Sequence, residues 1–225
     1  MFDPCGWLLP VFVKGKVFLQ ELWLLKVEWD DSLPQDVLDR WHQFTKDLSK
    51  LSEISIPRLI NRHGQPTQVH LFADASEIAS SCALYIRLSP SSPENRAEVR
   101  LIVAKSKVAP LKRVSLPRLE LVVATMATEL LRRYATTLEH YEVNKIFAWT
   151  DSSIVLSWIQ TPTYRLKTFV ANRVTSIHET PQSVIWRHVK SSDNPADCAT
   201  RGLSPEQLSN FSLWWSGPRW LSAIF

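Results

Sequence analysis

The chain has 225 residues, and its content of 45% hydrophobic and 21% charged residues is ordinary for a globular protein, which excludes wholesale disorder. Lys and Arg (26) outnumber Asp and Glu (22), and the net charge of +4 is compatible with a polyanionic partner but too small to require one. The three cysteines contain no CxxC pair, which argues for a reducing compartment and against a disulfide scaffold or a zinc site. No apolar run approaches the roughly 20 residues that span a bilayer and no signal peptide is evident, so we expect no membrane segment.

Residues 1–66 have the pattern of a small helical segment that is separate from the rest of the chain. Apolar residues after Pro10 predict a helix that ends near Trp29. These apolar residues are Val13, Val17, Leu19, Leu22, Trp23 and Leu25. Ser32 predicts the N-cap of a second helix, whose apolar face extends to Leu51. We interpret the polar run at 61–68 as a linker.

From residue 67 the apolar period changes to two, which is typical of β-strands. Three strands with short connections are predicted at 69–74, 81–88 and 98–105, and they form an antiparallel meander. Pro117 begins the strongest helix of the chain, with Ser115 as a candidate cap.

The second half of the chain alternates helices and strands. The predicted elements are a strand at 145–150, helices at 152–160 and 167–179, a strand at 183–188 and a helix opened by Asn194-Pro195. This order predicts an α/β domain at 67–204, built on a mixed five-stranded sheet flanked by helices. The aromatic tail at 205–225 is expected to pack on the body.

Four acidic residues stand at the ends of these elements. Asp74 and Asp151 end two strands, and Glu120 is expected in the first turn of the long helix. Asp197 falls in the first turn of the last helix, where Asp193 is an alternative as a cap. Four neighbouring carboxylates would repel one another unless cations neutralised them, and oxygen ligands without His or Cys select Mg²⁺ or Mn²⁺. Such a cluster fits two-metal phosphodiester cleavage.

Four motifs contain these acids, in the order FADAS, PRLEL, WTDSS and NPADCATRG. In this succession they resemble the ribonuclease H domain of BEL/Pao-type LTR retrotransposon polyproteins, a family that also carries the name Pao retrotransposon peptidase. The flanking segments FDPCGWLLPV and WWSGPRWL are similar to the family as well, so the resemblance covers nearly the whole chain.

The resemblance implies a ribonuclease H-like α/β fold, with residues 1–66 as a connection from the end of the reverse transcriptase region. The implied catalytic, metal-binding carboxylates are Asp74, Glu120, Asp151 and Asp197, which would hold two Mg²⁺ or Mn²⁺ ions. His188 would assist proton transfer or product release, and Asn194 and Arg201 would shape the last helix or contact phosphate. The implied partners are an RNA/DNA hybrid and the polymerase part of the same polyprotein. No small-molecule cofactor is expected, and the implied location is intracellular, in the cytoplasm (virus-like particles) or the nucleus.

Other polar and aromatic residues are candidates for binding nucleic acid. Ser76, Ser152 and Ser153 follow the strand acids and would donate to phosphate, although the last two also suit a helix cap. A basic run before the long helix suits either a solvated loop or a rim that binds the backbone. It comprises Lys105, Lys107, Lys112, Arg113 and Arg118. The tail tryptophans Trp214, Trp215 and Trp220 are expected to pack, with base stacking as the alternative.

Two other functions compete with the nuclease. An aspartic peptidase would use Asp74 and Asp151, but neither is followed by the Gly of a peptidase turn, and Glu120 and Asp197 would have no role. The other alternative is a catalytically idle retroelement remnant that binds nucleic acid or depends on a missing polymerase partner.

Overall fold

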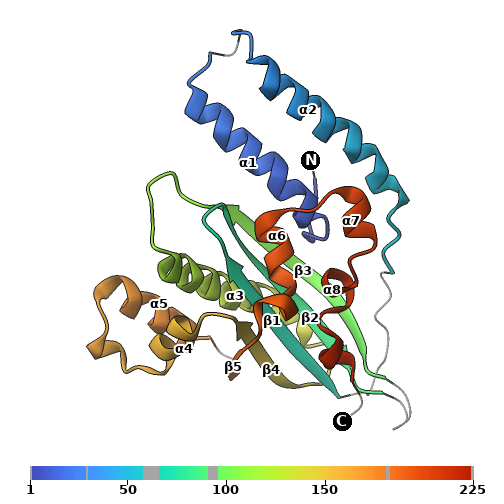
Figure 1. Ribbon diagram of the computed structural model, residues 1–225. Coiled ribbons are helices and arrows are strands. Elements are labelled where there is room, and N and C mark those ends of the chain that lie inside the picture. The colour runs from blue at the N-terminus through green and yellow to red at the C-terminus, as the bar shows by residue number, and fades with distance from the viewer. Residues whose placement is uncertain (1, 29, 58–65, 91–95, 181–182, 224–225) are drawn as a thin grey trace.

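The centre of the protein is a five-stranded sheet with the order β3-β2-β1-β4-β5 (Figure 1). The computed structural model describes residues 2–28, 30–57, 66–90, 96–180 and 183–223. The strands are β1 (Thr67–Ala75), β2 (Ala79–Leu88), β3 (Glu98–Val108), β4 (Val143–Thr150) and β5 (Val184–His188). Strands β1 to β3 are antiparallel neighbours, whereas β4 is parallel to β1 and β5 is parallel to β4. The predicted meander and the mixed sheet are thereby confirmed.

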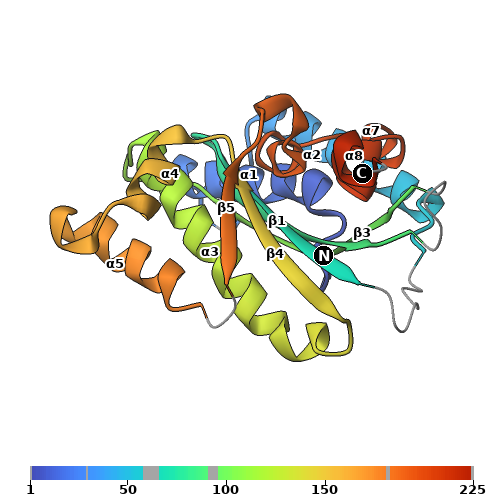
Figure 2. The ribbon, with the colours of Figure 1, turned by 90° about the horizontal axis from the view of Figure 1, so that it is seen from below.

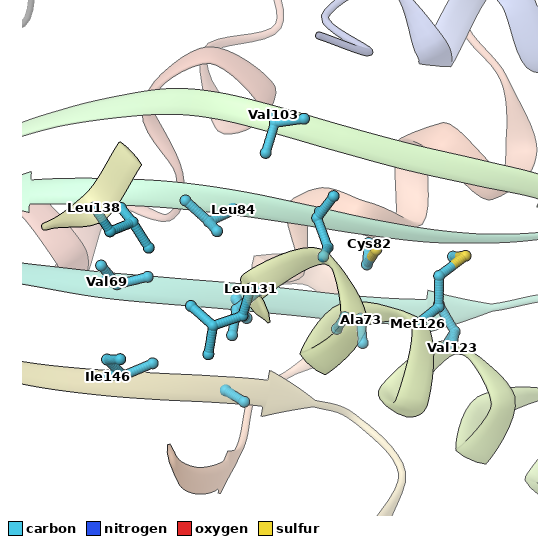
Figure 3. Packing of buried hydrophobic residues seen from close by; sticks show 14 of the residues in the cluster. Val69, Ala73, Cys82, Leu84, Val103, Val123, Met126, Leu131, Leu138 and Ile146 are labelled. Atoms are coloured by element: carbon cyan, nitrogen blue, oxygen red, sulfur yellow. The ribbon is translucent and has the colours of Figure 1, made fainter. Parts of the chain in front are cut away.

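One face of the sheet is covered by the long helix α3 (Leu116–Leu138), which buries a continuous apolar stripe (Figure 3). Val123, Met126 and Leu131 of α3 pack with Val69 and Leu84 of the sheet. The helix begins one residue before the predicted Pro117, and the side chain of Ser115 makes no capping hydrogen bond. Helices α4 (Ser153–Gln160) and α5 (Thr168–His178) add a smaller cluster against the outer side of α3.

The other face carries helices from both ends of the chain (Figure 2). They are α1 (Leu9–Leu25), α6 (Cys198–Arg201), α7 (Pro205–Ser209) and α8 (Ser212–Ser216). Trp214 of α8 is fully buried, and its carbonyl oxygen accepts a hydrogen bond of 2.6 Å from the Tyr85 hydroxyl. Trp214 thereby joins the hydrophobic cluster on this face of the sheet. Short 3₁₀ helices connect the elements, namely η1 (Ser49–Glu53), η2 (Thr163–Arg165), η3 (Ser191–Asp193), η4 (Pro195–Asp197) and η5 (Arg219–Ser222).

The described part of the N-terminal segment packs on the sheet, whereas the sequence pattern predicts a separate helical segment. Leu9 and Phe12 lie in the same hydrophobic cluster as Phe72 and Trp214. Helix α1 ends at Leu25, and α2 (Gln35–Leu48) follows Pro34 and not a cap at Ser32. Of the predicted linker, residues 61–65 lie outside the described residues, whereas Thr67 and Gln68 already belong to β1.

The second half of α1 does not bury the apolar residues that predicted the helix. Leu19, Trp23 and Leu25 are 55%, 78% and 45% exposed, because only the first half of α1 lies against the sheet. Beyond it, α1 contacts α2, where the rings of Phe18 and Trp41 stack with centroids 5.4 Å apart. Within the described residues, no helix has both the length and the apolarity needed to cross a membrane.

Candidate active site

Two parallel strands bring two of the acids to the same edge of the sheet. Phe72 of β1 pairs with Trp149 of β4, and Asp74 and Asp151 each stand two residues beyond this pair. Glu120 is the fifth residue of α3, just past the first turn in which it was expected, because the helix begins one residue earlier, at Leu116. Asp197 ends η4 directly before α6. Four different elements thus supply the four predicted carboxylates.

The electrostatics show that these carboxylates are neighbours. Burial raises the pKa of Asp74 to about 7; a Thr200 hydrogen bond opposes this rise, and the charges of Asp151 and Asp197 add to it. Burial also raises the pKa of Glu120 and of Asp197, and in both cases the charge of Asp151 contributes to the rise. Asp151 is therefore the one acid that acts on all three others, and Asp197, not Asp193, acts on Asp74.

Each carboxylate also has a donor within the protein. The pairs are Thr200 Oγ1 to Asp74 Oδ2 (2.8 Å), Ser152 Oγ to Glu120 Oε2 (2.6 Å), Ser191 Oγ to Asp151 Oδ2 (2.6 Å) and Arg201 Nε to Asp197 Oδ1 (2.8 Å). Sequence reasoning missed Thr200 and Ser191. Thr200 follows Asp197 by three residues in a helical turn, a spacing that would have indicated it, whereas no sequence signal indicates Ser191.

The donor chemistry of the cluster fits a hard cation. Its side chains offer carboxylate and hydroxyl oxygens, which Mg²⁺ and Mn²⁺ prefer, and a bound cation would relieve the mutual repulsion of the acids. Among the described residues, no three His, Cys, Asp or Glu side chains gather closely enough to hold a metal ion as they stand. Binding would therefore require the carboxylates to move closer together.

Comparison with known proteins decides the family. The sequence model of the Pao retrotransposon-like RNaseH-like domain matches residues 1–152, which is more than half of the chain. The chain belongs to this family. The resemblance seen in the sequence is confirmed, and with it the ribonuclease H-like α/β fold.

Solved structures with a similar arrangement are remote. Ribonuclease H1 of the archaeon Halobacterium salinarum is 13% identical over 60% of this chain and 93% of its own, with a TM-score of 0.37. LC11 ribonuclease H1, solved with an RNA/DNA hybrid, is 12% identical over 58% of this chain and 91% of its own, with a TM-score of 0.36. The foamy viral protease-reverse transcriptase, solved with double-stranded DNA, is 13% identical over 77% of this chain and 33% of its own, with a TM-score of 0.45. No protein with a curated description matches the chain.

In this Pao-family domain, His188 lies at the edge of the acidic cluster. It ends β5 opposite Thr150, and its exposed ring places Nε2 3.2 Å from the carbonyl oxygen of Asp151. Ser152 caps α4 by accepting from the Val155 amide, in addition to its bond to Glu120. Ser153 is exposed in the first turn of α4.

Two of the predicted nucleic-acid contacts are instead engaged inside the protein. Asn194 is 1% exposed, its Nδ2 donates to the Ala73 carbonyl at 3.0 Å, and its Oδ1 accepts from the Ala196 amide. It shapes the turn before α6, and the expected phosphate contact is wrong because no polar atom of Asn194 is free to reach solvent. The Ser76 hydroxyl accepts from the backbone amides of the β1–β2 turn and so stabilises that turn.

The predicted basic run is spread over several surfaces. Lys105 and Lys107 lie on the edge strand β3, opposite Cys82 and Ser80 of β2. Arg113 is exposed in the loop before α3, with its nearest carboxylate, Glu77, 4.0 Å away. Lys112 is exposed in the same loop, and Arg118 lies 5.1 Å above the ring of Phe169 in α5. Arg201 pairs with Asp197 but leaves 71% of its side chain exposed.

Proposed function

We propose that this chain is a metal-dependent endonuclease that hydrolyses the RNA strand of RNA/DNA hybrids and derives from a retrotransposon polyprotein. The observation that carries the proposal is the convergence of four carboxylates from four elements, with Asp151 raising the pKa of the other three. Apart from the pair of Arg201 with Asp197, this cluster places acids beside one another, which costs stability unless a cation compensates it.

The proposed ligands of two Mg²⁺ or Mn²⁺ ions are Asp74, Glu120, Asp151 and Asp197. The ions, when bound, would activate water and stabilise the leaving oxygen of the phosphodiester. The hydroxyls of Thr200, Ser152 and Ser191 hold three of the carboxylates in place before the ions arrive. His188 is exposed beside Asp151, where its imidazole can exchange protons with bulk water and so assist proton transfer or product release.

The backbone of the substrate would be bound by cations around the cluster. Arg201 lies beside Asp197, whereas Lys105, Lys107 and Arg113 would bind the backbone farther along the exposed or half-exposed surface, and Ser153 presents an exposed hydroxyl at the start of α4. Contacts of this kind would select a hybrid through 2′-hydroxyls and groove shape, not through base sequence.

A partner-dependent domain is the second candidate, favoured by the exposed apolar end of α1. Leu19, Trp23 and Leu24 are 55%, 78% and 60% exposed, which suits a surface covered by the polymerase part of a polyprotein. In that case the isolated chain would associate with itself or remain inactive until that partner is supplied.

The decisive experiment is cleavage of an end-labelled RNA/DNA hybrid in Mg²⁺. We expect the wild-type chain to cut the RNA strand, Asp151→Asn to lose at least about 100-fold in rate because a charged ligand is removed, and chelator to abolish cutting. Asp193→Asn is the matched control, because this acid lies in the neighbouring η3 without acting on Asp74, and it should retain activity. A folded wild-type protein that leaves the hybrid intact would refute the autonomous nuclease.

A further inference from the structure

One part of the sheet face opposite α3 is open to solvent. In β5, Ile185 and Arg187 are exposed, whereas the alternate residues Val184 and Trp186 are half-buried against the α3 side. Helix α8 packs on β3, at the far edge of the sheet, and Figure 2 shows that α7 and α8 lie away from β5. The exposed face of β4 and β5 is therefore available to a ligand.

Aromatic rings line this open face. The ring of His70 in β1 stacks on that of Phe147 in β4 with centroids 5.2 Å apart and planes inclined by 20°. Trp149 follows on the same side of β4, and its ring centroid is 4.7 Å from that of Trp220 in η5. Together they border a pocket of about 500 Å³, a size typical of sites for small aromatic ligands.

The rings are held by a hydrogen-bond chain that fixes the charge of His70. Trp149 Nε1 donates to His70 Nδ1 at 3.1 Å, so the proton of the neutral imidazole resides on Nε2, 3.3 Å from Gln68 Oε1. Burial, followed by the charge of Arg87, lowers the pKa of His70 to about 3, so the ring stays neutral at physiological pH. His70 is only 3% exposed, so its uncharged ring supports the stacked rings of Phe147 and Trp149 and does not itself face solvent.

Positive charge in the pocket comes from arginine. Arg187 is exposed, and its guanidinium lies 5.7 Å from the Phe147 ring centroid. Among the described residues it has no carboxylate within 4.0 Å, and none of the described pocket-lining residues is acidic. Arg87 at the back of the pocket donates to the Leu221 carbonyl and so anchors the tail beside Trp220. The pocket therefore favours a ligand that combines a flat ring with negative charge.

Strand β4 connects the pocket to the acidic cluster, because it carries Phe147 and Trp149 and leads directly into Asp151. Phe147, Trp149 and Asp151 alternate along β4 and its end, and side chains two residues apart on a strand face the same side, about 6.6 Å from one another. The aromatic rings therefore stand within roughly 13 Å of the carboxylates, on the same face of the sheet.

We propose that these residues (Gln68, His70, Phe147, Trp149, Arg187 and Trp220), the aromatic platform, bind the bases of an unpaired nucleic-acid strand. Bases would stack on the half-exposed rings of Phe147, Trp149 and Trp220 without sequence preference, and Arg187 would neutralise a phosphate. Beside a hybrid at the carboxylates, such a strand would be its single-stranded extension. This placement depends on the proposed nuclease function, whereas strand binding itself does not.

The test is fluorescence anisotropy of a labelled single-stranded DNA dodecamer and its RNA equivalent, in chelator so that no cutting occurs. We expect Phe147→Leu and Arg187→Gln each to weaken binding of both strands by about five-fold or more, since one stacked base or one phosphate contact is lost. The matched controls are Tyr164→Leu and Arg165→Gln, a second exposed ring and guanidinium 5.6 Å apart in η2, which should bind as the wild type does. Quenching of tryptophan fluorescence by the strand should weaken in parallel, because Trp149 and Trp220 border the pocket.

The platform proposal would be wrong if the platform variants bound the strands as tightly as the wild type. It would also be wrong if the control variants lost as much affinity as the platform variants. Because Arg187 is exposed, Arg187→Gln should have the melting temperature of the wild type. Weaker binding by this variant would then reflect a lost contact with the strand and not a loss of folded protein. Cleavage of a blunt-ended hybrid by the same proteins separates the two proposals. If the platform variants bind the strand more weakly but no protein cuts the hybrid, only the nuclease proposal is rejected. If the hybrid is cut but the platform variants bind the strand as the wild type does, only the platform proposal is rejected.

Discussion

Asp74 is a buried carboxylate whose charged form is costly in electrostatic terms. Its carboxyl is 6% exposed and titrates with a pKa of about 7 instead of the ordinary 3.8. Below pH 3.8 both the folded and the unfolded chain hold this proton. Between pH 3.8 and about 7 the unfolded chain has lost it while the folded chain retains it, so the free energy of unfolding falls as the pH rises through this window.

Asp74→Asn should therefore stabilise the metal-free protein at pH 8. The gain should be roughly 2–4 kcal/mol, since one pKa unit corresponds to about 1.4 kcal/mol, and it should shrink towards pH 4. Urea unfolding in chelator at both pH values measures it, with the half-buried acid Asp193 changed to Asn as the control. A gain that is the same at both pH values would contradict the raised pKa.

The acidic residues of the site could be predicted from the sequence, whereas most of their hydrogen-bond partners could not. Asp74 and Asp151 could be predicted because each stands at or directly after the end of a strand, where a lone acid stands out against apolar neighbours. The hydroxyl of Ser191 could not, because its contact with Asp151 spans 40 residues and depends on how η3 returns to the sheet. Asn194 was expected at the surface in part, yet the turn into α6 encloses it.

At the scale of elements, the N-terminal segment is joined to the sheet by its backbone. The carbonyl of Cys5 accepts a hydrogen bond of 2.8 Å from the Ala104 amide of edge strand β3. Gly6 makes this approach possible, because its φ of +71° is left-handed and a Cβ there would stand 2.0 Å from the Ala104 carbonyl oxygen. The segment thereby protects the edge strand from pairing with other chains.

Gly6→Ala should separate this segment from β3. We expect a loss of at least about 1–3 kcal/mol, the usual cost of a left-handed non-glycine residue, together with the clash. Thermal or urea unfolding measures the loss. Cys5→Ala is the control, because it keeps the backbone bond and removes only a half-buried side chain. Equal stability of Gly6→Ala and wild type would show that the segment contributes little to the fold.

At the scale of the whole molecule, the two ends of the chain meet over one core. Trp214 Nε1 donates to the Trp7 carbonyl at 2.8 Å, across 207 residues of sequence. Leu203 N donates to the Pro10 carbonyl at 2.7 Å, which links α1 to the segment after α6. The boundaries expected at residues 66 and 204 stay predictions, and the packing across them is extensive.

The excised piece 67–204 should therefore fold poorly. It would expose the apolar residues that α1 and α8 cover, among them Phe72 and Tyr85, both fully buried in the full chain. We expect the piece to lose its cooperative thermal transition and its near-ultraviolet circular dichroism, whereas the full chain keeps both. A cooperative melt of 67–204 close to that of the full chain would instead establish it as an independent domain.

The order and kind of the sheet elements, the family and four acids near element ends could all be predicted from the sequence, because they depend on local periodicity and short motifs. The tertiary structure alone decided which surfaces meet. The exposed apolar end of α1, the hydroxyl partners of the carboxylates and the rings of Phe147, Trp149 and Trp220 around one pocket all depend on contacts between distant segments. Periodicity shows that a residue is apolar or polar, but only the assembled sheet shows whether a neighbour covers it.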